Sequence, residues 1–134
     1  MKLPLSWLSA YVSAPPVDAL ATRLTEIGHM VDGPLQNTPD GPVIPLEIRQ
    51  NRPDCLSILG LAREVAAAFG LALPAVAEAP LPRDARALTV GDDPLLLLRL
   101  DGVALADLPA SMRARLEQYG QRLVHPLVDL SNYV

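Results

Sequence analysis

The chain has 134 residues, of which 50% are apolar and 19% are charged, and this composition excludes an intrinsically disordered protein. Its formal net charge of −4 lacks the basic surplus that is typical of proteins gripping a nucleic-acid backbone. The single cysteine, Cys55, excludes an internal disulfide, and no run approaches the roughly 18 apolar residues of a membrane span. We therefore expect a cytoplasmic protein with no membrane partner. The 14 prolines, about twice the usual share, predict short elements.

The first third of the chain predicts two helices that form a hairpin with one apolar face. A short amphipathic helix is expected over residues 6–12. The prolines at 15–16 then break the chain and suit the first turn of a second helix. Apolar residues repeat at helical spacing along that second helix, and Gly28 is a natural stop for it.

A loop, a strand and a long helix are expected next. Residues 33–42 hold the Gly, Pro, Asn and Asp of a loop, and alternating apolar residues then predict a strand over 43–49. Pro45 places that strand at a sheet edge or near its own start, because proline cannot donate to a ladder. Asp54 is expected to cap the following helix, which ends at Gly70. Its apolar face comprises Ile58, Leu61, Ala62, Val65 and Phe69, with Arg63 and Glu64 outside it.

The last part of the chain begins with a Pro/Ala-rich linker over residues 74–86, which is a candidate domain boundary. A buried strand is expected over 95–103, and a helix capped by its first residue over 107–119. Residues 123–130 predict a last strand, followed by a turn or a short helix. The elements together indicate the α+β class.

The residues that could carry chemistry are few. His29 and His125 belong to no ligand-spaced pair and Cys55 to no CxxC motif, so we expect no metal site. His125, beside a proline, is typical of a hydrogen-bonded packing residue. Cys55 is better explained as a small buried thiol than as a nucleophile. No glycine-rich phosphate loop is present in the sequence, so we predict no catalytic residue and no cofactor site in this chain.

The densest polar cluster lies where the expected strand meets the long helix. In a structural interpretation, Asp54 caps the helix, Asn51 and Pro53 shape the turn, and Arg49 and Arg52 pair with nearby acidic or backbone groups. In a functional interpretation, the two arginines bind a phosphate or an acidic partner beside the helix N-terminus. The structural interpretation is favoured, since Asp54 adds negative charge at that terminus.

Three segments carry a resemblance to a known family: residues 3–12 (LPLSWLSAYV), 20–33 (LATRLTEIGHMVDG) and 46–70 (LEIRQNRPDCLSILGLAREVAAAFG). They resemble the bacterial phenylalanyl-tRNA synthetase beta subunit. The resemblance implies that residues 1–73 are its N-terminal B1 domain. In that family an OB-fold tRNA-binding domain is inserted there, and the loop at 33–42 occupies the insertion point here.

The resemblance resumes near the C-terminus, where residues 97–105 and 127–134 look like the start of the family's B3/B4 editing domain. It implies that residues 87–134 are a truncated B3/B4-like segment. Ser131 and Asn132 match positions that line the pocket for hydrolysis of mischarged Tyr-tRNA in that family. Aminoacylation itself, with its ATP and Mg²⁺, belongs to the family's alpha subunit.

Three hypotheses follow from this resemblance. The first is a non-catalytic binding or assembly module, a truncated paralogue that associates with an alpha subunit or with itself. The second is a working part of a phenylalanine-tRNA ligase, active in aminoacylation with an alpha subunit or in editing. The third is a small tRNA-binding module that uses Arg49, Asn51, Arg52 and Arg63. The first hypothesis is favoured, because part of an editing domain does not make a closed pocket.

Overall fold

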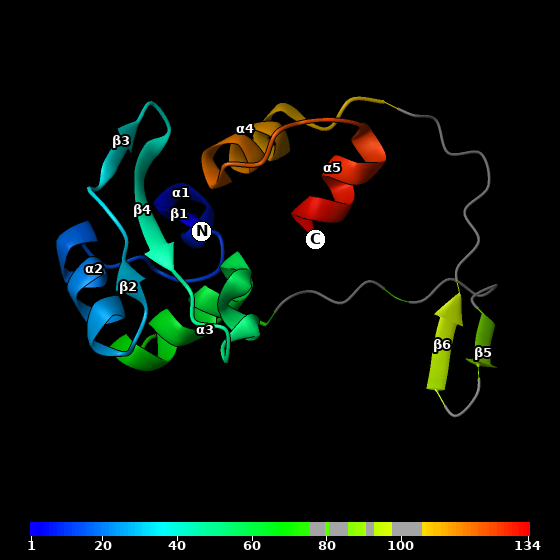
Figure 1. The fold of residues 1–134 in the computed structure, drawn as a ribbon, viewed down its shortest axis with the longest axis horizontal. Coiled ribbons are helices and arrows are strands. Elements are labelled where there is room, and N and C mark those ends of the chain that lie inside the picture. The colour runs from blue at the N-terminus through cyan, green and yellow to red at the C-terminus, as the bar shows by residue number, and fades with distance from the viewer. Residues whose placement is uncertain (76–79, 81–85, 91–92, 98–105) are drawn as a thin grey trace. The chain divides into compact units, whose positions relative to one another are not determined.

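The computed structural model describes residues 1–75, 80, 86–90, 93–97 and 106–134 (Figure 1). The chain divides into two compact units. Met1–Pro74 and Asp107–Val134 together form the first unit, and Ala75–Ala106 forms the second. The first unit combines helices with a small antiparallel sheet, which confirms the α+β class. Within the described residues, no helix is both long enough and apolar enough to cross a membrane.

The sheet of the first unit is organised around β4 (Gly41–Glu47). β1 (Lys2–Pro4) pairs with it on one side, and β3 (Gln36–Thr38) and β2 (Met30–Val31) pair with it on the other, all antiparallel. The expected loop at 33–42 therefore contains a strand. The polar residues of β3 have little strand propensity of their own, and the hairpin with β4 supplies their pairing.

The expectation that Pro45 lies in an edge strand or near the start of its strand is wrong, because β4 is central and Pro45 lies toward its end. Pro45 stands beside Lys2 of β1, and its carbonyl accepts a hydrogen bond from the Asp32 N–H at 3.0 Å on the opposite side. Asp32 lies between the end of β2 and the start of β3. The missing N–H of Pro45 thus falls where ladder pairing is interrupted, and the sheet loses no hydrogen bond there.

The first helix is shorter than expected, and the second lies where the sequence predicts it. α1 (Leu5–Leu8) is a single turn, rather than the helix expected over 6–12. α2 (Val17–Glu26) follows the two prolines, and Gly28 comes just beyond its C-cap with a φ of +100°. The left-handed backbone at Gly28 explains why the helix stops there. Both helices pack against α3.

α3 (Ile58–Phe69) is preceded by a single 3₁₀ turn, η1 (Pro53–Leu56). The expected cap is wrong: Ser57, not Asp54, is the N-cap residue, and its hydroxyl accepts a hydrogen bond from a first-turn N–H at 3.0 Å. Pro53 starts a 3₁₀ turn first, so the N-cap lies three residues beyond Asp54 and the α-helix begins at Ile58. Gly70 ends the helix in the left-handed conformation, as predicted.

One hydrophobic core joins β1, β4 and the first three helices. The predicted apolar face of α3 lies in it, with Leu61, Ala62 and Val65 fully buried. The core also requires a glycine at position 60, since a Cβ atom there would lie 1.8 Å from the carbonyl oxygen of Asp54. Its buried members are Leu3, Trp7, Leu8, Val12, Leu20, Leu24, Ile44, Leu46, Cys55, Ile58, Leu61, Ala62, Val65 and Ala66.

The C-terminal part of the first unit consists of α4 (Ala110–Tyr119) and α5 (Pro126–Tyr133). α4 begins after Pro109, so Asp107 is not its cap. A helix replaces the strand expected over 123–130, because a proline at its first position and a capping side chain before it start a helix there. That capping residue, His125, is exposed, and its Nδ1 accepts from the Leu127 N–H at 3.3 Å. His125 is hydrogen-bonded, as predicted, but it is exposed and caps a helix instead of packing.

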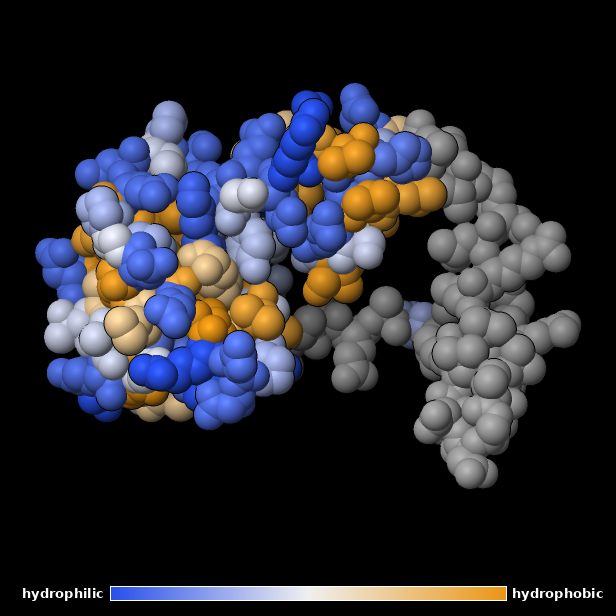
Figure 2. Space-filling model, in the orientation of Figure 1, coloured by the Kyte–Doolittle hydropathy of each residue, from blue (hydrophilic) through white to orange (hydrophobic). Residues whose placement is uncertain are grey.

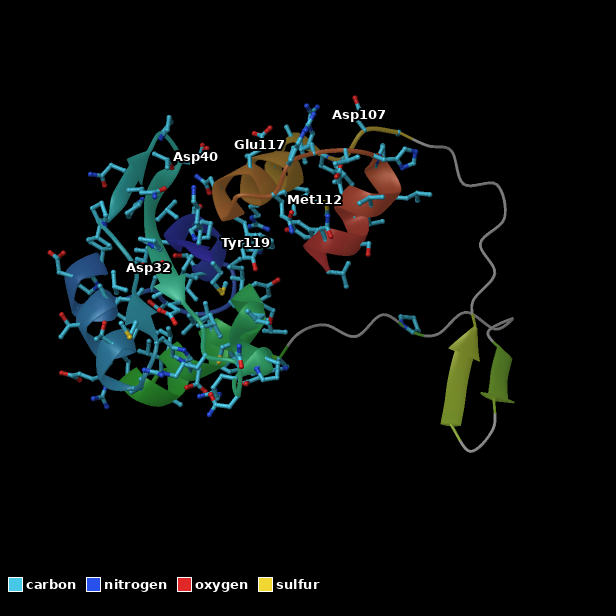
Figure 3. All side chains as sticks on the ribbon, viewed as in Figure 1. Asp32, Asp40, Asp107, Met112, Glu117 and Tyr119 are labelled. Atoms are coloured by element: carbon cyan, nitrogen blue, oxygen red, sulfur yellow. The ribbon has the colours of Figure 1, made fainter. Side chains whose placement is uncertain are left out.

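Aromatic contacts with Trp7 attach α4 and α5 to the rest of the first unit. The Tyr133 ring stacks on Trp7 at 4.9 Å, and Tyr119 meets the same indole edge-on at 6.1 Å. Tyr119, labelled in Figure 3, also donates its O–H to the Leu56 carbonyl at 3.1 Å. Arg115 donates to the Tyr133 hydroxyl and lies 5.9 Å from the Trp7 ring centre. One indole therefore contacts both helices, and α4 also packs against β1.

The second unit contains one described hairpin, β5 (Arg86–Val90) paired antiparallel with β6 (Asp93–Leu97). β6 covers the beginning of the strand expected over 95–103, and residues 98–105 lie outside the described part of the chain. The spatial division at 74 and 107 differs from the division into 1–73 and 87–134 proposed from the family resemblance. The two compact units are defined by contacts between residues, whereas the domain boundaries come from the resemblance and stay a prediction.

Candidate functional site

Arg52 is the centre of the polar cluster that the sequence singles out. Its Nη2 lies 2.7 Å from Oδ2 of Asp54, and its Nε donates to Oδ1 of the same carboxylate at 3.1 Å. Nη2 also lies 2.6 Å from Oε1 of Glu64 on α3. One guanidinium therefore ties the turn before η1 to the long helix. Glu64, which the helical pattern leaves outside the apolar face, is a partner in this network.

The ion pairs set the charges of the cluster. The hydrogen bonds from Arg52 hold the pKa of Asp54 well below its usual range and also lower the pKa of Glu64. The same two carboxylates raise the pKa of the Arg52 guanidinium. All three groups are therefore ionised at neutral pH. Arg52 has its charge balanced within the chain, as the structural interpretation of the cluster requires.

Cys55 lies beneath this network and is fully buried. Its Sγ is 3.1 Å from Nη2 of Arg52 and 3.3 Å from Oδ2 of Asp54. Burial, followed by the hydrogen bond to Asp54, raises the pKa of the thiol to about 12. The thiol is thus protonated at neutral pH and is no nucleophile in this state. The prediction of a buried cysteine is confirmed.

His29 also belongs to this site, although its spacing in the sequence assigns it to no ligand pair. It lies between α2 and β2, is only 1% exposed, and neither ring nitrogen has a hydrogen-bond partner among the described residues. Its Nε2 is 3.7 Å from Oε2 of Glu64. No local motif connects His29 with Cys55 and Glu64, because the three come from different elements that only the tertiary fold brings together.

The other cluster residues lie at the surface. Arg49, Asn51 and Arg63 are exposed, and Arg49 has Nη2 3.9 Å from the Met30 sulfur. The Arg52 N–H donates to the Arg49 carbonyl at 2.9 Å, which closes the turn that leads into η1. The structure therefore separates a paired arginine at position 52 from two exposed arginines at 49 and 63.

Ser131 and Asn132 are exposed on α5. A small pocket of about 160 Å³ lies at the N-terminal end of the same helix, and neither residue lines it. Asp129 is its buried carboxylate and accepts the Val124 N–H at 2.9 Å. Ser131 and Asn132 are therefore not part of this pocket. The pocket lining comprises Asp107, Leu108, Arg113, Leu123, Val124, His125, Pro126 and Asp129.

The outer side of α5 is apolar. Leu127, Val128 and Leu130 are between 41% and 53% exposed, and the flanking Val124 and Val134 are more exposed still. We call these five residues the α5 apolar face, and Figure 2 shows hydrophobic residues over this helix. An apolar helix face of this kind is typical of a surface that another chain segment covers.

Comparison with known proteins confirms the resemblance to one family. The phenylalanine–tRNA ligase beta subunit of Bordetella pertussis is 45% identical over 103 residues. Those of Nitratidesulfovibrio vulgaris and Clostridium tetani are 41% and 35% identical over 104 residues. Each alignment covers 71% of this chain but only 13% of the relative. No family model matches the chain. No solved structure matches it either.

Proposed function

We propose that the chain acts as a non-catalytic binding or assembly module related to the phenylalanine–tRNA ligase beta subunit. One observation carries this proposal. The chain is up to 45% identical to those subunits, but the match covers only 13% of their length. The site chemistry agrees with it, since Cys55 is a protonated buried thiol and Ser131 and Asn132 lie outside the described pocket. Residues 1–73 correspond in this proposal to a B1-like domain and 87–134 to a B3/B4-like segment.

The partner in this proposal is a synthetase alpha subunit, because the relatives are named as beta subunits of a ligase. The α5 apolar face is the surface that fits such an association. Burying a side chain such as Leu127 removes apolar area from water at about 25 cal/mol per Å². Self-association through the same face is the alternative within this proposal.

The test is light scattering of the purified chain at micromolar concentration, alone and mixed with the alpha subunit from the same organism. We expect a complex with the alpha subunit, and we expect Leu127→Asp to weaken it by at least about tenfold because a buried carboxylate is costly. Ser111→Asp, exposed on α4 and outside the α5 apolar face, is the matched control. Monomers in both samples would overturn the proposal, and a homodimer alone would select the alternative.

A second candidate is a contact with tRNA, which the exposure of Arg49 and Arg63 favours. Replacing each with Gln is expected to weaken binding and to reduce its salt dependence, since each arginine would release about one counterion from a phosphate. Arg52, which is paired within the chain, is expected to contribute little. Binding that is absent, or insensitive to salt, would remove this candidate.

Editing of mischarged tRNA is the alternative function that differs most from a non-catalytic role. The observation in its favour is the match of Ser131 and Asn132 to editing-pocket positions in the family. The assay is deacylation of Tyr-tRNA(Phe) by the purified chain, in which we expect no activity above the uncatalysed rate. Activity that Asn132→Ala abolishes would contradict the non-catalytic proposal.

A further inference from the structure

The residues His29, Cys55 and Glu64 bring three different donor atoms together. A ring nitrogen, a sulfur and a carboxylate oxygen from these residues lie within 4.8 Å of one another. They come from the segment after α2, from η1 and from α3, so the core of the first unit holds them in place. Nitrogen, sulfur and oxygen donors converging on one point suit a borderline-soft divalent cation and do not suit Mg²⁺ or Ca²⁺.

His29 is the independent observation that points to a ligand at this position. The imidazole is 1% exposed, and neither of its nitrogens has a hydrogen-bond partner among the described residues. Its nearest carboxylate oxygen, on Glu64, is 3.7 Å away, which is too long for a hydrogen bond. A buried imidazole without partners costs stability unless something binds it.

The Arg52 guanidinium already fills a cation position in this cluster. Its Nη2 lies 2.6 Å from Glu64 Oε1 and 3.1 Å from Cys55 Sγ. Its two-point pairing with Asp54 does not depend on either contact. The side chain is 33% exposed, so it can turn toward solvent with Asp54 and leave Glu64 and Cys55 to another cation.

We propose that His29, Cys55 and Glu64 form a zinc site that the metal enters in exchange for the Arg52 guanidinium. The Sγ–H bond of Cys55 breaks, its proton goes to solvent, and a sulfur–zinc bond forms without any change of oxidation state. Neutral His29 supplies nitrogen and Glu64 supplies oxygen. The net charge of Zn²⁺ with one thiolate and one carboxylate is zero, which suits a buried site.

The test is titration of the full chain with Co²⁺, whose thiolate charge-transfer absorption reports a sulfur–metal bond, followed by displacement with Zn²⁺. We expect the band in the unaltered chain, its loss in Cys55→Ser, and weaker binding by at least about tenfold in His29→Gln. Absence of the band from the unaltered chain and from Arg52→Gln would overturn the proposal.

The decisive variant is Arg52→Gln, because the exchange predicts tighter binding when the competing cation is removed. We expect an increase in Zn²⁺ affinity of about tenfold, from the loss of one unit charge near the site. Arg63→Gln, one position before Glu64 and exposed, is the control and is expected to leave the affinity unchanged. Circular dichroism checks folding, and Arg52→Met, which also removes the charge, replaces Arg52→Gln should the latter unfold. Affinity that falls in a folded position-52 variant would contradict the exchange.

Discussion

Residues 1–74 and 107–134 belong to one compact unit, yet they are packed very differently. Among the described residues, every buried apolar side chain except Leu116 lies in the first region. Most of the strongly exposed large apolar side chains lie in the second, on and around α5. This difference shows that the first region supplies most of the core. The second region is attached to it through Trp7, through contact of α4 with β1, and through a few hydrogen bonds.

The largest expected effect compares two buried leucines, Leu61 in α3 and Leu116 in α4. Their exposed fractions are 0% and 1%, so burial alone predicts the same cost for both. We expect Leu61→Ala to lower the free energy of unfolding by about 2–5 kcal/mol, and Leu116→Ala to fall at or below the low end of that range. Hydrogen exchange should show global loss of protection for Leu61→Ala but loss confined to α4 and α5 for Leu116→Ala. Equal and global loss of protection in both variants would show that the two regions unfold as one unit.

Gly60→Ala tests how tightly the first region is packed. Helix propensity alone predicts a gain of about 1 kcal/mol, since alanine is the better helix former. The added Cβ would meet the Asp54 carbonyl oxygen at 1.8 Å, so we expect a net loss of about 1–3 kcal/mol instead. Ala67→Gly, at an exposed position of the same helix, measures the effect of helix propensity without a steric clash. Urea denaturation measures both, and a stabilised Gly60→Ala variant would show that η1 can move away from α3.

The parts of the fold that could be predicted are those whose signals are local. For α3, helical periodicity predicts the buried face and a terminal glycine predicts the end of the helix. The structure contains both features. The cap at Asp54 was mispredicted because Pro53 starts a 3₁₀ turn, and the pattern of residue types fits either geometry. β3 was missed because its polar residues become a strand only through pairing with β4.

The candidate site divides in the same way. Arg52 and Asp54 are two positions apart, so the sequence shows their cluster and the structure shows their ion pair. His29 lies far from Cys55 and Glu64 in the chain, and no spacing rule connects a residue after α2 with residues of η1 and α3. Ligand-spacing motifs detect sites built on one element or one loop, so the sequence predicted no metal ligands here.

Tyr133→Leu addresses the docking of the second region. The ring stacks on Trp7 at 4.9 Å, and aromatic pairs contribute about 0.5–1.5 kcal/mol beyond the area they bury. We expect a loss of that size, with a red shift of the fluorescence of Trp7, the single tryptophan, as α5 leaves the indole. Asn132→Ala, exposed on the same helix, is expected to change neither quantity. A fluorescence spectrum unchanged by Tyr133→Leu would show that α4 alone holds the second region.

The smallest expected effect is a loss of folding stability at low pH, and it arises in the first region alone. Arg52 lowers the pKa values of Asp54 and Glu64 in the folded state, so the unfolded chain takes up protons first as the pH falls. Their stabilisation is therefore present at neutral pH and is lost as the pH drops through the lowered pKa values.

We expect the urea midpoint of Arg52→Gln to fall less between pH 7 and about pH 3 than that of Arg63→Gln, the matched control that keeps the ion pairs. The difference should shrink in high salt, since Asp54 is exposed and its pairing with Arg52 is screened by solvent. Equal acid sensitivity in the two variants would mean that the Arg52 network contributes nothing to folding. The stability of the first region would then rest on its apolar core alone, and Arg52 would be free to give up its position to a metal ion at little cost.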